Sequence, residues 1–195
     1  MSRADFHLSK EMREELKKIK IFNNCVFEFD KGWYEIIYDL GMKIVSFCDH
    51  QNIKYPHIQQ IKEKFGTLRF YYCWQEDVVQ EYKDIVKDWV LEAERLSELT
   101  CESCGASGQL LVSDGIWAVT CNTHRKSNSL TVDEFKTQRD IEARARRKCS
   151  ICGINNADIF FDGLELKPYC DNHKNNFITH DEYFENRFKI KETNK

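Results

Sequence analysis

The chain has 195 residues, of which 42% are hydrophobic and 13% aromatic, and its formal net charge is −3. This composition excludes a disordered polymer and supplies enough apolar surface for one large or two small folded domains. The near-neutral charge excludes strong general attraction to nucleic acid, so any such binding has to rest on a local basic patch.

No apolar run approaches the roughly 18 residues that a membrane span needs, and the N-terminal residues lack the apolar core of a signal peptide. We therefore expect a cytoplasmic protein without a membrane partner. Six of the nine cysteines fall into two sets with metal-ligand spacing, which favours reduced thiols over disulfides. The other three, Cys25, Cys48 and Cys73, are expected to be small buried side chains, with a reactive thiol as the alternative.

The first 100 residues predict an α+β domain. Residues 8–20 place Leu8, Met12, Leu16 and Ile19 on one stripe of an amphipathic helix. A short strand is expected at 25–29 and a second helix at 33–48, despite Gly41. A β-hairpin near 58–74, with its turn at Gly66-Thr67, and a long helix at 77–98 complete this domain.

The second half of the predicted hairpin, from Phe65 to Trp74, is rich in aromatic residues and lies close to Lys62, Lys64 and Arg69. A strand of this kind is more often half-buried in the core of its domain. The alternative is a platform on which the bases of a single-stranded nucleic acid stack.

A first set of metal-ligand residues follows directly after the long helix: Cys101, Cys104, Cys121 and His124. Two close pairs of soft ligands, separated by a hairpin, are the usual way in which one short segment surrounds a tetrahedral zinc ion. About fifty residues later the pattern recurs as Cys149, Cys152, Cys170 and His173.

The recurrence extends beyond the ligands and indicates an internal duplication. Gly105 and Gly153 follow the second cysteine of each set, and Asp114-Gly115 and Asp162-Gly163 are both expected to form type I′ hairpin turns. Thr131-x-x-Glu134 and Thr179-x-x-Glu182 predict capping boxes at the start of a closing helix. We therefore expect two tandem zinc-stapled knuckle-hairpin-helix modules, at 101–148 and 149–195, similar to treble-clef or zinc-ribbon units.

Four protein ligands leave no open coordination position, so two structural Zn²⁺ ions are the preferred interpretation of the two sets. A catalytic zinc ion requires one of the four residues to lie outside the metal's shell. Redox pairing of the Cys-x-x-Cys motifs is the remaining alternative.

Four motifs, in this order, resemble an uncharacterised family of small bacterial and phage proteins. They begin at Trp33 (Trp-Tyr-Glu-Ile-Ile-Tyr-Asp-Leu), at Ile61 (Ile-Lys-Glu-Lys-Phe-Gly-Thr-Leu-Arg-Phe-Tyr-Tyr), at Ala93 (Ala-Glu-Arg-Leu-Ser) and at Cys101 (Cys-Glu-Ser-Cys-Gly). The likeness covers roughly residues 32–124. It implies a bacterial or phage setting and no activity or catalytic residue.

The preferred function is that of a non-enzymatic, zinc-binding interaction protein with a protein partner. No phosphate-binding glycine loop, nucleophile elbow or His-Glu-x-x-His helix occurs in the sequence. The pairs Asp49-His50 and His180-Asp181 place an acid beside a histidine, but adjacent residues rarely face one site.

Two alternatives stay open. The first is a DNA- or RNA-binding protein that uses a basic helix at 139–148, assisted by Arg125 and Lys126. The basic residues of this helix are Arg139, Arg144, Arg146, Arg147 and Lys148. The second is a nuclease of the treble-clef class, but neither hairpin carries the Asp-His pair that such enzymes place after the first knuckle.

Overall fold

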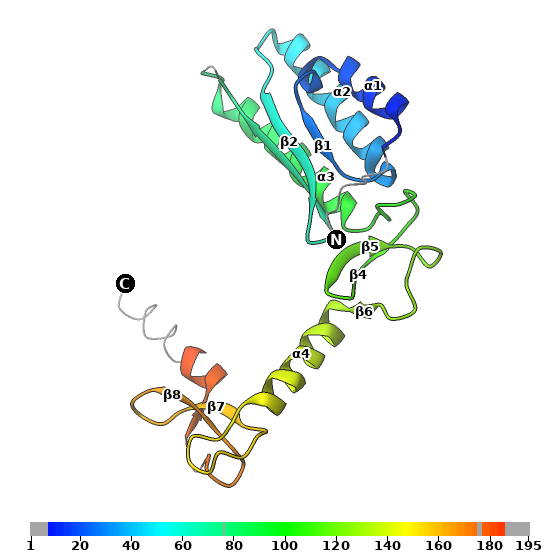
Figure 1. Cartoon of the computed structure of the whole chain (residues 1–195). Coiled ribbons are helices and arrows are strands. Elements are labelled where there is room, and N and C mark those ends of the chain that lie inside the picture. Colours follow the sequence, from blue (N-terminus) through cyan, green and yellow to red (C-terminus); the bar gives the residue numbers. More distant parts are fainter. Residues whose placement is uncertain (1–7, 76, 175–176, 186–195) are drawn as a thin grey trace. The chain divides into compact units, whose positions relative to one another are not determined.

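The computed structural model describes residues 8–75, 77–174 and 177–185 (Figure 1). It is a mixture of helices and small sheets, as the α+β class predicts. The chain divides into two compact units, and the boundary in the sequence lies between Val132 and Asp133. None of the helices in the described residues is long and apolar enough to cross a membrane.

The elements of the first unit follow in chain order. They are α1 (Lys10–Lys18), the 3-10 turn η1 (Lys20–Phe22), β1 (Val26–Glu28), the 3-10 turn η2 (Lys31–Trp33), α2 (Tyr34–Gln51), β2 (His57–Lys64), β3 (Thr67–Cys73), α3 (Gln80–Ser97), β4 (Gln109–Ser113), β5 (Ile116–Thr120) and β6 (Leu130–Thr131). The second unit contains α4 (Val132–Arg146), which begins at the boundary, with β7 (Asp158–Phe161), β8 (Leu166–Tyr169) and β9 (Ile178–Thr179).

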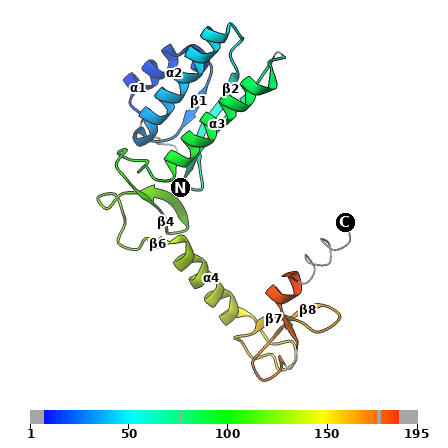
Figure 2. The ribbon, with the colours of Figure 1, turned by 180° about the vertical axis from the view of Figure 1, so that it is seen from behind.

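The core of the first unit lies between a three-stranded sheet and its helices. Strand β1 pairs in parallel with β2, and β2 pairs antiparallel with β3. Helices α2 and α3 lie side by side on one face of this sheet (Figures 1 and 2). Ile61, Leu68 and Phe70 of the sheet are buried in one cluster with Trp33 and Ile37. Packing of these apolar side chains, rather than helix propensity, holds the helices in place.

Helix α2 runs through Gly41 because an aromatic ring occupies the space of its missing side chain. A Cβ atom built on Gly41 would lie 2.4 Å from the ring of Phe22 in η1. The glycine therefore allows η1 to approach the helix closely, at a cost of about 1 kcal/mol in helix propensity. This contact explains why a glycine stands in the middle of the predicted helix.

The outer edge of β3 is covered by side chains of α3. The backbone N–H of Leu68 donates to Ser97 Oγ at 2.9 Å, and that of Phe70 donates to a carboxylate oxygen of Glu94 at 3.1 Å. These bonds satisfy donors that would otherwise be free at a sheet edge. The aromatic strand is half-buried as predicted: Phe70 is in the core and Tyr72 packs against it, while Tyr71 is exposed.

The turn between β2 and β3 is one residue earlier than predicted. It consists of Phe65 and Gly66, whose φ angles are 54° and 77°. Both angles are positive, as a two-residue type I′ turn requires. A bulky aromatic residue is strongly disfavoured in this conformation, so the sequence offered no signal for Phe65 at the first turn position.

The two Asp-Gly pairs also differ from each other. Asp114 and Gly115 form the expected type I′ turn, with φ angles of 53° and 76°. In contrast, β7 and β8 are joined by the four residues 162–165, so a type I′ turn at Asp162-Gly163 was the wrong prediction. Asp162 instead accepts the backbone N–H groups of Leu164 and Glu165, both at 3.0 Å, and this side-chain bonding builds a wider loop.

The helices that follow the two Cys/His sets begin where the capping patterns place them. Helix α4 starts at Val132, directly after Thr131. In the second unit a helical turn starts at His180. There the N–H of Glu182 donates to Thr179 Oγ1 at 3.3 Å, and the N–H of Thr179 donates to the Glu182 carboxylate at 2.9 Å. This reciprocal pair is a capping box.

Candidate metal centres

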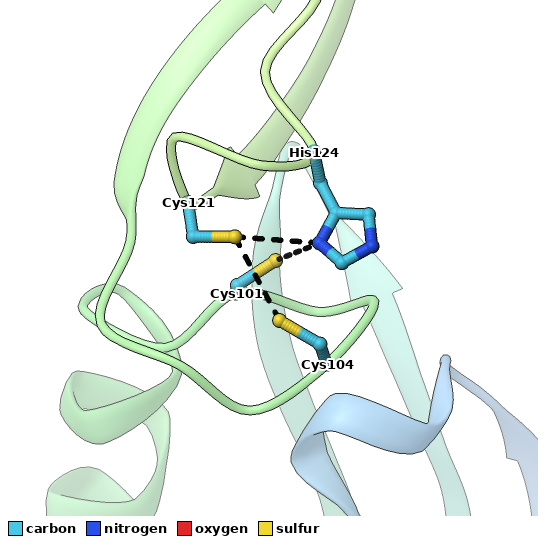
Figure 3. Close-up of side chains that lie close together, drawn as sticks. All are labelled: Cys101, Cys104, Cys121 and His124. Atoms are coloured by element: carbon cyan, nitrogen blue, oxygen red, sulfur yellow. Dashed lines mark hydrogen bonds between the residues drawn. The ribbon is translucent and has the colours of Figure 1, made fainter.

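The first cluster is assembled by the end of a helix and by a β-hairpin. Helix α3 delivers the chain to Cys101, Cys104 follows in a tight turn, and the β4–β5 hairpin returns the chain to Cys121 and His124 (Figure 3). The imidazole Nδ1 of His124 lies 3.7 Å from the sulfur of Cys101 and 3.3 Å from that of Cys121. The sulfurs of Cys104 and Cys121 are 3.7 Å apart.

The second cluster has nearly the same dimensions. His173 Nδ1 lies 3.6 Å from the sulfur of Cys149 and 3.3 Å from that of Cys170. The sulfurs of Cys152 and Cys170 are 3.8 Å apart. In both clusters all four ligand atoms lie within 4.8 Å of one another, so each group is placed to hold one metal ion.

These separations fit a tetrahedral site. With metal–sulfur distances of about 2.3 Å and a metal–nitrogen distance of about 2.0–2.1 Å, the ligand atoms of a tetrahedron are roughly 3.6–3.8 Å apart. The sulfur pairs match this spacing and are far from the bonding distance of about 2.05 Å in a disulfide. Both histidines turn Nδ1 toward the sulfurs, and the close-up shows the other ring nitrogen of His124 pointing away from them (Figure 3).

The turns that carry the first two ligands of each cluster share the same backbone bonding. In the first Cys turn, residues 100–107, the N–H of Gly105 donates to the carbonyl of Cys101 at 2.8 Å. In the second Cys turn, residues 148–155, the N–H of Gly153 donates to the carbonyl of Cys149 at 2.9 Å. Both glycines have positive φ, 79° and 70°, which only glycine adopts without strain.

The surroundings favour thiolates at two ligands. The side chain and backbone N–H of His124 lower the pKa of Cys121 to about 6. Burial raises the pKa of Cys149, but backbone N–H groups, those of Cys152 and Cys170 first, outweigh burial and lower the pKa to about 5. Thiolates are the form in which cysteine binds metal, so Cys121 and Cys149 are prepared for ligation.

The exposed cysteine of each Cys turn shows the opposite trend. The backbone N–H of Ala106 lowers the pKa of Cys104, but desolvation and the neighbouring thiols Cys101 and Cys121 outweigh it, so the net shift is upward. The pKa of Cys152 is raised by the same balance of causes. Several thiols crowd around each centre, and a cation there would relieve their mutual repulsion.

The first Cys turn also packs against the N-terminal part of its unit. The N–H of Gly32 donates to the carbonyl of Glu102 at 2.7 Å, and the indole N–H of Trp33 donates to the carbonyl of Thr100 at 2.9 Å. A Cβ atom on Gly32 would lie 2.1 Å from the carbonyl oxygen of Cys101. Only glycine therefore permits this approach, and the first cluster is joined to the hydrophobic core.

The hairpin tip of β2–β3 makes a second contact with this segment. A Cβ atom on Gly66 would lie 2.4 Å from the side chain of Leu110 in β4. The ring of Phe65 meets that of Trp117 in β5 edge-on, with centroids 6.5 Å apart. Sequence reasoning missed both contacts, because they join residues far apart in the chain and only the glycines hinted at close approach.

Some of the basic residues predicted for nucleic-acid contact form ion pairs with carboxylates. Arg144 lies 3.3 Å from Asp158 and 3.5 Å from Asp171. Arg146 lies 3.1 Å from Glu142. Arg139 is over the ring of Phe135. The remaining predicted residues, Arg147, Lys148, Arg125 and Lys126, come from two different units.

The other candidate residues from the sequence are not among the ligands of the two clusters. Cys25 and Cys48 are buried as expected, and burial raises their pKa values to about 12 and 11. Burial was the wrong prediction for Cys73, which is exposed at the end of the edge strand β3. Asp49 bonds with Lys20 and Tyr55. His50 is exposed, as are His180 and Asp181.

No protein-family model, curated protein or solved structure matches the chain. The family that its sequence motifs resemble is thus not shown by these comparisons, and the bacterial or phage setting stays a prediction. The candidate metal centres are supported by the geometry of the chain's own residues.

Proposed function

We propose that both clusters bind Zn²⁺ and that the protein is a non-enzymatic interaction protein built on these two structural sites. The observation that carries the proposal is the pair of four-residue clusters with tetrahedral spacing. Three thiolates and an imidazole are a ligand set typical of structural zinc, and four protein ligands leave no position for a water or a substrate.

The two segments are copies of one treble-clef-like unit, in which zinc joins a Cys turn to the end of a hairpin. The matching bonds of Gly105 and Gly153 support this interpretation. Small units of this size bury little apolar surface, so metal binding supplies much of their folding free energy. The surfaces that the metal holds in place then bind a protein partner.

The nucleic-acid alternative has weaker support. Phosphate binding needs basic side chains that can exchange counterions for phosphate. Arg144 and Arg146 already pair with carboxylates of their own unit. Binding through α4 would require these pairs to break, and a salt-sensitive interaction with an oligonucleotide would restore this alternative.

Metal analysis of the purified full chain tests the proposal. Mass spectrometry under native conditions should show two zinc ions per chain. X-ray absorption at the zinc edge should show three sulfur ligands at about 2.3 Å and one nitrogen at about 2.0–2.1 Å. A single metal per chain, or an oxygen ligand at either site, would contradict two closed structural centres.

A further inference from the structure

The two Cys turns differ in what covers them. Gly32 and Trp33 cover the first turn by donating to the carbonyls of Glu102 and Thr100. The corresponding carbonyls of the second turn are those of Ser150 and Lys148. Among the described residues, none donates a hydrogen bond to either of them.

The second turn has the same backbone shape, so the comparison is direct. The N–H of Cys101 donates to the carbonyl of Ala106, and that of Cys149 donates to the carbonyl of Ile154, both at 2.8 Å. The N–H of Glu102 donates to the carbonyl of Val119 in β5 at 3.1 Å, and the N–H of Ser150 donates to the carbonyl of Pro168 in β8 at 2.8 Å. The outward carbonyls thus occupy equivalent positions.

The space around the two glycines differs accordingly. A Cβ atom on Gly105 would lie 3.2 Å from the carbonyl oxygen of Gly32, whereas one on Gly153 would meet nothing within 4 Å. Two apolar side chains flank Gly153: Ile151 is 60% exposed and Ile154 is 64% exposed. The first turn has Ser103 and Ala106 at the corresponding places. The second turn therefore exposes two isoleucines and two carbonyls at the positions where Gly32 and Trp33 cover the first turn.

We infer that the second Cys turn, at residues 148–155, is a docking site for a glycine–aromatic turn of a partner protein. The partner places a glycine N–H on the carbonyl of Ser150 and an aromatic N–H donor on that of Lys148, as Gly32 and Trp33 do on the first turn. The partner's glycine is required because a side chain at that point would strike the backbone, as the 2.1 Å contact at Gly32 shows. Apolar residues of the partner lie against Ile151 and Ile154.

This inference rests on the proposed function, because zinc has to order the second turn. The chain's own turn supplies the probe: a head-to-tail cyclic peptide with the sequence of residues 28–35, Glu-Phe-Asp-Lys-Gly-Trp-Tyr-Glu. Its matched control is the same peptide with alanine in place of glycine. Each is titrated into the isotope-labelled, zinc-loaded full chain, and binding is followed by NMR, which detects and locates weak complexes.

We expect saturable shifts of the amides of residues 148–154 and none at residues 100–106, whose partner is already in place. The alanine peptide should bind roughly tenfold more weakly than the glycine peptide, or not at all. The glycine peptide should show the same loss when it is titrated into the Ile151→Asp variant of the chain. Ala106 occupies the position in the first turn that Ile154 occupies in the second. Ala106→Asp should leave the affinity of the chain for the glycine peptide unchanged.

No shifts at millimolar peptide, shifts confined to another surface, or equal binding of the two peptides would overturn the docking site. Metal analysis of the same sample separates the two proposals. Two zinc ions without peptide binding leave the structural centres standing and remove the docking site. Fewer than two zinc ions remove the structural centres themselves.

Discussion

The two Cys/His segments have the same ligands but different surroundings. The first is anchored by Gly32 and Trp33 and by the β2–β3 hairpin tip, and Cys101 is completely buried. Within the described residues, the second has a core of four buried side chains, Cys149, Ala157, Phe160 and Tyr169, and α4 contributes no buried residue. The first motif is thus held by hydrogen bonds and close contacts with the rest of its unit, while the second has few buried residues of its own.

The largest expected effect follows from removing one ligand in each segment. Cys152→Ser should release the second metal and unfold residues 149–174, because structural zinc contributes on the order of 10 kcal/mol to such units. Cys104→Ser should release the first metal but leave β1–β3, α2 and α3 folded, since their core does not include the cluster. Hydrogen exchange mapped by mass spectrometry distinguishes the two outcomes.

If Cys104→Ser removed protection equally from β1–β3, α2 and α3 and from the first cluster, the first metal would hold the entire first unit. Retained protection at 149–174 after Cys152→Ser would mean that the second segment folds without its ion.

A smaller effect is expected at two glycines: Gly32, which packs against the first Cys turn, and Gly153, which lies within the second. Gly32→Ala forces a Cβ atom against the carbonyl of Cys101 and should destabilise the first unit by about 2–3 kcal/mol. Gly153→Ala meets no atom within 4 Å, but its φ of 70° should cost about 1 kcal/mol. Urea unfolding followed by tryptophan fluorescence measures the first effect, because all four tryptophans lie in the first unit. Hydrogen exchange of residues 149–154 measures the second. A neutral Gly32→Ala would show that the close contact is not maintained in solution.

The smallest expected effect concerns the hairpin tip. Phe65→Asn should stabilise the first unit by up to about 1 kcal/mol, because asparagine tolerates the positive φ that Phe65 adopts. The lost edge contact with Trp117 reduces this gain. Thermal unfolding measures the change, and a clear destabilisation would show that the Phe65–Trp117 contact outweighs the backbone strain.

The two ligand sets could be predicted from sequence because their geometry is local. Cys-x-x-Cys-Gly defines its own turn, and Asp114-Gly115 defines its own hairpin. The dipeptide Asp162-Gly163 led to the wrong turn type, because the Asp162 side chain accepts the backbone N–H groups of Leu164 and Glu165. A dipeptide pattern does not reveal these bonds. The docking of Gly32 on Cys101 could not be predicted, since it joins residues about seventy positions apart and is decided by tertiary packing.

Stepwise metal removal tests the difference between the two segments most directly. Chelator is added to the zinc-loaded chain, and each cysteine is then alkylated in a short pulse and mapped by mass spectrometry. Before chelation only the exposed Cys73 should react quickly, since Cys25 and Cys48 are buried. Cys149, Cys152 and Cys170 should react next, in a chain that still holds one zinc ion, and Cys101, Cys104 and Cys121 last. Release of both metals together, or of the first cluster before the second, would contradict this account.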